Sequence, residues 1–388
     1  MIVKIEELLE RARTRLNLAV VYAGNKTDPG IVIHPQKNSR DWKSYKLVAE
    51  NIAQTLEHEG FSGVAVLAEG RDLAAELARL KIDLVWLNTG GVQGIDPMAH
   101  APSLLEMLGI PYVGHSPLSA SLLDNKHVFK SMCLAAALPT ARFTVIPPEY
   151  EEIDPTDSER FRATFGNYPG PFVVKPVTGR ASKNVHFVES ADRLKAAVDK
   201  VCQQTGHLCL VEEFLPGDEF AISVMGPLIR QAGKFSTLTD AFAFSAVQRV
   251  FEPLEKIFTS MDEKPITHER IRILDGQHDR DVVDRMGRLA REVFGYFNLD
   301  SLVRLDMRRA ANGDLFLLEA NPKPDLRRPT DTIASITCSA LDHHGLSYQD
   351  LIMSIFAERL VQLTQISRGE SPISSKLVES AAPLAVAT

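Results

Sequence analysis

Residues 301–321 have the sequence SLVRLDMRRAANGDLFLLEAN. The Asn-Gly pair at 312–313 lies between two apolar runs, which is the strongest short signal for a β-hairpin turn. Side chains two residues apart on a strand point to the same face. The predicted hairpin therefore gathers three hard oxygen ligands beside one arginine: Asp306, Glu319, Asn321 and Arg304.

Hard oxygen ligands at a single site suit Mg²⁺ that is held jointly with the phosphates of a substrate. The alternative is a hairpin whose acidic residues simply face solvent. The rest of the chain has to distinguish these two interpretations.

Composition sets the broad class of the protein. A chain of 388 residues with 45% hydrophobic and 24% charged residues predicts two or three domains of an ordinary globular protein. The net charge of -7 argues against a nucleic-acid binder with a broad basic surface. The four cysteines show no metal-ligand spacing, and no apolar run is long enough for a membrane span or a signal core. We expect a cytoplasmic protein that binds neither nucleic acid nor membrane.

The first part of the chain alternates strands and helices, which predicts a parallel sheet covered by helices. We expect strands at 18–22, 64–67 and 84–87, and helices at 42–59, 72–80 and 103–108. This pattern defines an N-terminal α/β domain over residues 1–116.

The remainder predicts a mixed organisation. A helix is expected at 119–137, followed by strands at 172–176 and 185–188, a helix at 191–203, strands at 208–213 and 219–225, and a helix at 281–297. We place a central domain at 117–206 and a C-terminal domain at 207–365. Residues 226–276 lack clear periodicity and are interpreted as a lid, and the tail at 366–388 is predicted to be disordered.

Lys175 lies at the end of a compact apolar strand, Phe-Val-Val-Lys-Pro. Burying its charge is costly unless an anion compensates it. The small-residue loop at 178–182 follows, and its Gly179 and Ser182 let backbone N–H groups approach a phosphate closely. We interpret lysine and loop as a phosphate site, the alternative being a plain hairpin with a lysine that extends to solvent.

A second cluster is acidic. Val-Glu-Glu-Phe-Leu at 211–215 is followed by Gly-Asp-Glu-Phe at 217–220. Such a strand end can bind the edge of adenine, and Glu219 can accept hydrogen bonds from ribose hydroxyls. Taken alone, the pattern is explained better by an ordinary acidic strand end.

These elements, in this order, resemble the ATP-grasp superfamily and, within it, the D-alanine–D-alanine ligases, over residues 18–360. The most specific stretch is LEMLGIPYVGHSPLSASLLDNK at 105–126, and the sequences LPT, FVVKP, VEEF and LEAN follow in register. The fold that this implies is α/β, with a parallel-sheet N-terminal domain followed by central and C-terminal α+β domains that hold ATP between them.

The resemblance implies ATP and Mg²⁺ as cofactors, with two metal ions and Mn²⁺ as an alternative. Lys126 and Lys175 match lysines that contact the ATP phosphates, and Ser182 belongs to the loop beside them. Glu212 matches a carboxylate near adenine, with Glu213 and Phe214 next to it, and Glu219 matches the ribose ligand.

Lid and metal strands match as well. The segment FEPLEK at 251–256 is similar to the family's lid, which makes Lys256 a candidate γ-phosphate contact. Arg304 matches the arginine that stabilises negative charge during attack on an acyl phosphate. The hairpin oxygens match the Mg²⁺ ligands: Asp306, Glu319 and Asn321.

The pattern departs from the family where the substrates bind. The family's Glu, Ser and Tyr network is missing: the N-terminal loop offers only Asp28, Arg-Ala-Ser-Lys-Asn at 180–184 replaces Gly-Ser-Ser-Val-Gly, and Ile257 replaces the lid tyrosine. The loop at 322–331 also differs, and its charges suit carboxylate or zwitterionic groups unless it is a solvated surface loop. The candidate substrate residues are Asp28, Lys323, Asp325, Arg327 and Thr330.

We therefore expect an ATP- and Mg-dependent ligase of specialised metabolism that joins an amino acid to a small carboxylate or amino-acid-like donor through a phosphorylated intermediate. The resemblance also implies a homodimer. Alternatives are a D-alanine–D-alanine ligase of peptidoglycan synthesis, a mycosporine-type amino acid ligase, and a non-catalytic ATP-binding regulatory protein. A structural protein is disfavoured because it leaves the buried-strand lysine unexplained.

Overall fold

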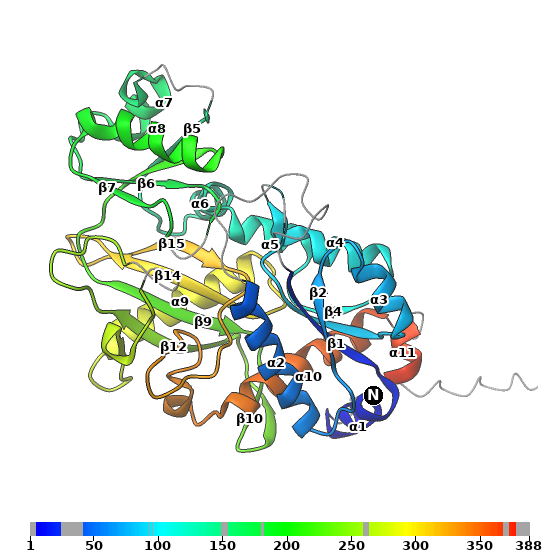
Figure 1. Cartoon of the computed structure of the whole chain (residues 1–388). Coiled ribbons are helices and arrows are strands. Elements are labelled where there is room, and N and C mark those ends of the chain that lie inside the picture. The colour runs from blue at the N-terminus through cyan, green and yellow to red at the C-terminus, as the bar shows by residue number, and fades with distance from the viewer. Residues whose placement is uncertain are drawn as a thin grey trace, which may run out of the picture.

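The computed structural model describes residues 5–24, 42–92, 94, 96–148, 154–179, 182–258, 264–367 and 372–377. Three main sheets organise these residues: a parallel N-terminal sheet, a central sheet and a C-terminal sheet. In Figure 1 the central sheet lies above the C-terminal sheet, with the N-terminal sheet to one side. No described helix is both long enough and apolar enough to cross a lipid bilayer.

The N-terminal sheet is four-stranded and parallel, in the order β2-β1-β3-β4. Its strands are β1 (Leu18–Ala23), β2 (Ala65–Glu69), β3 (Leu84–Asn88) and β4 (Tyr112–Val113). Its helices are α1 (Ile5–Arg15), α2 (Trp42–His58), α3 (Leu73–Arg79) and α4 (His100–Met107). All six residues of β1 are buried, as a strand covered on both faces requires. The predicted alternation of strands and helices is confirmed.

The central sheet has the order β5-β8-β6-β7 and is antiparallel. It contains β5 (Phe143–Ile146), β6 (Phe172–Pro176), β7 (His186–Val188) and β8 (Cys209–Glu213), with helices α7 (Glu159–Phe165) and α8 (Leu194–Thr205). Because β8 pairs with both β5 and β6, the predicted boundary after residue 206 separates this strand from its own sheet.

The predicted single helix at 119–137 is two helices, α5 (Pro117–Asp124) and α6 (Lys126–Ala135). Asn125 interrupts it with an extended ψ of 105°, and its side-chain oxygen accepts from the backbone N–H groups of His127 and Val128. An asparagine cap of this kind starts a new helix. Lys126 thus becomes the first residue of α6, and its N–H donates to the Val177 carbonyl beyond β6.

The C-terminal sheet has five strands in the order β13-β12-β9-β14-β15. They are β9 (Glu219–Met225), β12 (Phe242–Arg249), β13 (Ile271–Ile273), β14 (Val303–Arg309) and β15 (Leu315–Asn321), and helix α9 (Arg280–Tyr296) packs on them. Leu305 and Met307 point into the core at 0% exposure. The predicted hairpin is present as β14 and β15.

Residues 226–276 contain regular structure that the sequence does not predict. The hairpin β10 (Leu228–Gln231) and β11 (Lys234–Thr237) packs on α10 (Tyr348–Ser367), while β12 and β13 extend the C-terminal sheet. The interpretation of this whole range as a lid is therefore wrong. Only the stretch between β12 and β13 remains to fill that role.

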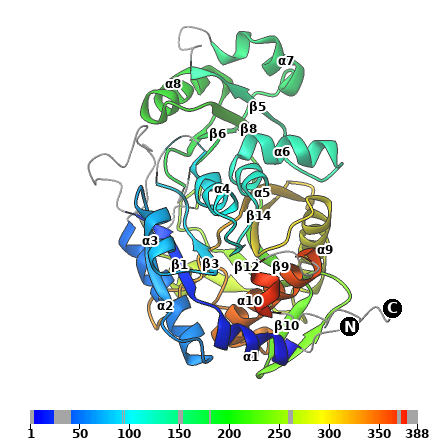
Figure 2. The same cartoon turned by 90° about the vertical axis from the view of Figure 1, so that its right-hand side faces the viewer.

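The predicted disorder of 366–388 is wrong for one part of the tail. Helix α11 (Pro372–Leu377) buries Ile373 and Leu377 and packs against α1 and α10, at the bottom right of Figure 1. Residues 378–388 lie outside the described residues. Figure 2, turned by 90°, shows α5 and α6 between the N-terminal helices and the central sheet.

Candidate active site

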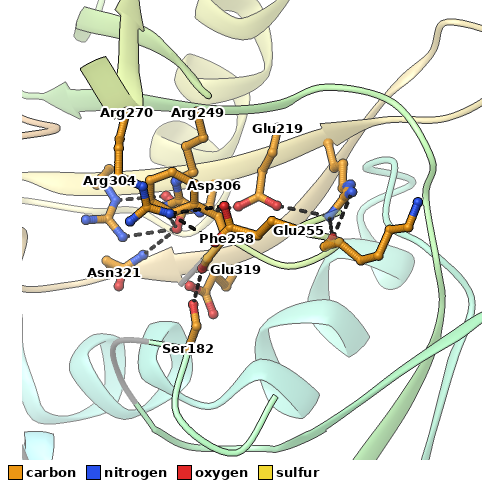
Figure 3. Close-up of polar contacts among 12 residues, drawn as sticks. Ser182, Glu219, Arg249, Glu255, Phe258, Arg270, Arg304, Asp306, Glu319 and Asn321 are labelled. Carbon is orange, nitrogen blue, oxygen red and sulfur yellow. Dashed lines mark hydrogen bonds and ion pairs between the residues drawn. The ribbon is translucent and has the colours of Figure 1, made fainter. Parts of the chain in front are cut away.

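The hairpin presents alternate residues of β14 to one cavity. Arg304, Asp306 and Arg308 line it, whereas the intervening Leu305 and Met307 are buried on the other face. The pairing register places Asp306 opposite Glu319, and Arg304 opposite Asn321. The period of two therefore delivers the predicted hairpin residues to one place, as Figure 3 shows.

The cavity encloses about 910 Å³ counted out to solvent and lies between the central and C-terminal sheets. Its charged groups form two ends. The lysine end consists of Glu212, Glu319, Lys126, Lys130 and Lys175, where Lys130 lies behind the lining residues. The arginine end consists of Glu219, Asp306, Arg249, Arg304 and Arg308.

At the lysine end, Glu212 is 2% exposed and pairs with two lysines. Lys175 donates to its Oε1, and Lys130 Nζ lies 3.1 Å from its Oε2. Burial alone would raise the pKa of Glu212, but the charges of Lys175 and Lys130 outweigh it and hold that pKa below its ordinary value. The buried-strand lysine thus has the compensating anion that its position requires.

The second lysine contact joins α6 to β15. Lys126 Nζ lies 3.0 Å from Glu319 Oε2 and 3.4 Å from the Gly179 carbonyl. Burial opposes ionisation of Glu319, yet Lys126 and Lys175 hold its pKa well below the ordinary range. Glu319 is therefore an anion at neutral pH, and a metal or phosphate arriving here would compete for these same ion pairs.

At the arginine end, Asp306 is 1% exposed and receives three short contacts. Arg304 donates Nε to Oδ1 at 2.8 Å and an NH2 group to Oδ2 at 3.0 Å, and Arg249 donates to Oδ2 at 2.7 Å. Such two-pronged contacts are the geometry that guanidinium groups favour with carboxylates. The carboxylate and both arginines are held in fixed orientations.

Glu219 is shared by two arginines. Arg249 donates to its Oε1 and Arg308 to its Oε2 at 3.1 Å. Arg308 also lies 4.5 Å from the centre of the Phe214 ring and donates to the Lys256 carbonyl at 3.2 Å from both terminal nitrogens. This arginine connects the Phe214 strand end to the segment after β12.

That segment closes one side of the cavity. Ile257 and Phe258 line it, and the Ser182 hydroxyl donates to the Phe258 carbonyl at 2.8 Å. The predicted phosphate loop and the lid segment are therefore in direct contact. Arg180 and Ala181 of the same loop lie outside the described residues.

Most predicted nucleotide residues line this one cavity: Lys126, Lys175, Ser182, Glu212, Glu213, Phe214 and Glu219. Lys256 does not line it, and its side chain is exposed. The carboxylate of Glu212 contacts lysines, which is a different environment from the adenine edge expected for it. Glu213 pairs with Arg142 at 2.7 Å on the more exposed side.

The predicted substrate residues of the loop after β15 are not among those that line the cavity. Lys323 Nζ lies 4.2 Å from the centre of the Tyr45 ring and 3.4 Å from Asn88 Oδ1, at the carboxyl end of β3. Asp325 accepts from the Arg327 N–H, and Thr330 accepts from the Ile333 N–H. The loop thus packs toward the N-terminal domain. Asp28 lies outside the described residues.

The donor set can be compared with the needs of a metal ion. The described residues include no group of three or more His, Cys, Asp or Glu side chains placed to hold one. The predicted set has two carboxylates and one amide, with Asn321 Nδ2 at 3.5 Å from Asp306 Oδ2. Mg²⁺ is usually bound through one or two carboxylates together with substrate phosphates. The residues therefore fit Mg²⁺ that arrives with a nucleotide.

Sequence reasoning missed three cations of the site. Arg308 continues the alternation of Arg304 and Asp306, and Lys130 follows Lys126 by one helical turn, so both had a usable signal. Arg249 has none, because its partners Glu219 and Asp306 are 30 and 57 residues away.

Comparisons with known proteins place this geometry in a family. Residues 132–357 match the family model described as D-ala D-ala ligase C-terminus, which is more than half of the chain. The chain belongs to this family. A D-alanine–D-alanine ligase of Desulforudis audaxviator is 27% identical over 317 residues, covering 81% of this chain and 91% of that protein. A second, from Herminiimonas arsenicoxydans, is 26% identical over 81% of this chain and 86% of its own length.

Solved structures agree on the fold. A D-alanine–D-alanine ligase from Bacillus anthracis, in complex with ATP, superposes with a TM-score of 0.65 at 17% identity, over 91% of this chain and 99% of that one. The ATP-grasp fold predicted from the sequence is confirmed, and so is the assignment as an ATP-grasp ligase that forms a C–N bond with release of ADP and phosphate.

Proposed function

We propose that this ligase joins the amine of one amino acid to the carboxylate of a donor other than D-alanine, with ATP and Mg²⁺ as cofactors, in specialised metabolism. The observation that carries the proposal is the joint presence of Arg304, Asp306, Glu319 and Asn321 on one hairpin facing the lysine end. The residues that the ligase reaction needs for ATP and Mg²⁺ are thus present. The positions expected to hold the donor, by contrast, differ from the family pattern.

The nucleotide would bind between the two ends. Phe214 and Glu219 support contacts to adenine and ribose, and Lys126 and Lys175 supply charge for the phosphates. Asp306, Glu319 and Asn321 would hold Mg²⁺, which offsets charge on the transferring phosphoryl group when it is bound. The charges of the two carboxylates are compensated in the structure by Lys126, which pairs with Glu319, and by Arg249 and Arg304, which pair with Asp306.

The proposed reaction has two steps. A donor carboxylate oxygen attacks the γ-phosphorus of ATP, so that an acyl phosphate forms and ADP is released. The amine then attacks the acyl carbon, Arg304 stabilises the negative oxygen that develops, and phosphate leaves with its bonding electrons. The amine loses its proton to a base during this step.

The donor class is supported by the loop after β15. Lys323 lies beside Asn88 at the carboxyl end of β3, where open α/β sheets bind their ligands. One half-buried ammonium group in that place suits a carboxylate-bearing donor. D-alanine itself remains the second candidate, because the two D-alanine–D-alanine ligases compared above each match 81% of the chain.

The test is a panel of amino acids and small carboxylates, offered in pairs with ATP and Mg²⁺, in which ADP release is measured and the product mass is determined. We expect ADP release with a substrate pair other than two D-alanine molecules. Full turnover with D-alanine alone would contradict the altered donor, and nucleotide binding with no turnover on any pair would favour the regulatory alternative. Light scattering tests the homodimer, which stays a prediction.

A further inference from the structure

Arg249, the last residue of β12, touches both carboxylates of the arginine end. One terminal nitrogen contacts Glu219, and the other lies 2.7 Å from Asp306 Oδ2. In the proposed function Glu219 binds ribose and Asp306 binds the metal at the phosphates. A triphosphate that connects those two positions must therefore pass the Arg249 guanidinium.

The third nitrogen of the same group has no hydrogen-bond partner among the residues that the structure describes. Nε of Arg249 is buried and makes no hydrogen bond to any described residue, although the residue as a whole is only 8% exposed. Buried donors are nearly always satisfied, so an unpartnered donor on a residue that lines the cavity is explained by an acceptor that binds there. Metal binding at Asp306 would release a second donor of this arginine. The oxygens of a phosphate group are acceptors that suit several N–H donors of one guanidinium group.

The lid segment packs against Arg249 through Phe258, whereas the side chain of its lysine, Lys256, does not line the cavity. Phe258 is 1% exposed, and its ring centre lies 5.2 Å from the Arg249 guanidinium carbon and 4.3 Å from that of Arg270. By contrast, the Lys256 side chain is exposed, whereas its backbone carbonyl accepts a hydrogen bond from Arg308. Figure 3 shows Arg249 beside Asp306 and Phe258.

We propose that Arg249 is a catalytic residue that contacts the β- and γ-phosphate oxygens of ATP, in the role that the sequence assigns to Lys256. Arg249 donates hydrogen bonds and transfers no proton. It offsets charge while the bond from the γ-phosphorus to the bridging oxygen breaks, the bond to the donor carboxylate forms, and ADP takes the electron pair. This inference rests on the proposed function.

The test compares two nucleotides in three proteins by calorimetry. The dissociation constants of Mg²⁺–ADP and of a Mg²⁺–ATP analogue with a non-hydrolysable β–γ bridge are measured for wild type, Arg249→Gln and the matched control Lys256→Gln. We expect Arg249→Gln to weaken the triphosphate analogue by roughly tenfold to a hundredfold more than ADP. Lys256→Gln should change either constant by less than about threefold, as expected of an exposed charge.

Equal weakening of both nucleotides by Arg249→Gln would overturn the proposal, as would a larger triphosphate-specific loss from Lys256→Gln. Thermal unfolding and circular dichroism show whether each variant folds. If Arg249→Gln does not fold, Arg249→Lys is measured in the same way, and it should still lose triphosphate affinity selectively. If neither variant folds, Arg249 is a structural residue and the proposal is wrong. Failure of wild type to bind either nucleotide would instead contradict the proposed function.

Discussion

The two ends of the cavity solve the same electrostatic problem differently. At the lysine end, each ammonium group is a point charge, and Glu212 is compensated by two of them arriving from α6 and β6. At the arginine end, planar guanidinium groups bridge, so that Arg249 binds Glu219 and Asp306 at once. The lysine end thus fixes charge near the core of the central domain, whereas the arginine end links separate strands of one sheet around Glu219 and Asp306.

This difference indicates different tasks. Glu212 is nearly inaccessible, so removing its charge would leave two buried lysines uncompensated and would reduce stability. At the other end, Arg304 lines the cavity and retains 14% side-chain exposure. Substitutions at the first end should therefore reduce stability most, and substitutions at the second should reduce turnover most.

The largest effect is expected from Glu212→Gln. The change leaves two buried lysines without their anion, which should reduce the free energy of unfolding by about 3–5 kcal/mol. Glu213→Gln is the matched control. The Glu213 carboxylate pairs with Arg142, whose side chain is 45% exposed, so this substitution should cost less than about 1 kcal/mol. Urea unfolding followed by circular dichroism measures both, and equal losses would contradict the contrast between the two carboxylates.

Arg304→Ala should lower kcat about a hundredfold, because an oxyanion donor is commonly worth about 3 kcal/mol. Arg309→Ala on the same strand is the control, since Arg309 pairs at 3.5 Å with Asp218, which is 51% exposed. Steady-state ADP release measures both variants with the substrate pair found in the panel. An unchanged rate for Arg304→Ala would remove this residue from the chemistry.

Lys323→Ala should raise KM for the carboxylate donor about tenfold, the equivalent of one charge-assisted hydrogen bond. The KM for ATP should not change, because Lys323 contacts Tyr45 and Asn88 outside the nucleotide cavity. Arg328→Ala, which removes a contact to Thr55 and the face of Tyr348, serves as the control. A larger change for ATP than for the donor would show that this loop does not bind the donor.

The smallest effect concerns pH. The folded pKa of Glu212 lies below its ordinary value of 4.5, despite burial, because of Lys175 and Lys130. The unfolded state therefore binds more protons in acid, and the stability that Glu212 contributes is present above pH 4.5 and lost as the pH falls through the folded pKa. Unfolding measured between pH 7 and pH 3 should show a shallower slope for Glu212→Gln. Identical slopes would indicate that this carboxylate does not carry the acid sensitivity.

Local patterns explain what could be predicted from the sequence. The hairpin, the FVVKP strand and the Glu212–Glu219 cluster follow from periods of two and from turn residues within a few positions, and the structure contains them. The break at Asn125 was missed because apolar periodicity continues across it, although the asparagine cap is a known helix start. The strands within 226–276 were missed because β12 gains its place only by pairing with β9 and β13.

The contrast between local patterns and long-range contacts also explains which cations of the site could be predicted. Lys175 was identified because a lysine at the end of an apolar strand is conspicuous on its own. Arg249 became visible only when folding placed it against residues far away in sequence, at Glu219 and Asp306. Lys256 shows the converse, since its motif suggests a phosphate contact and the structure leaves its side chain exposed. Tertiary contacts, rather than motifs, decide which cations face the cavity.

The central claim is that both ends of the cavity serve one Mg²⁺–ATP site. The most direct test measures the affinity for a non-hydrolysable ATP analogue with and without Mg²⁺. Calorimetry on wild type and Asp306→Asn gives these affinities. We predict that Mg²⁺ tightens binding to wild type at least about tenfold, because the proposal assigns Asp306 and Glu319 to hold the metal with the phosphates. In Asp306→Asn this enhancement should be lost. An equal Mg²⁺ enhancement in both proteins, or its absence in wild type, would contradict the account.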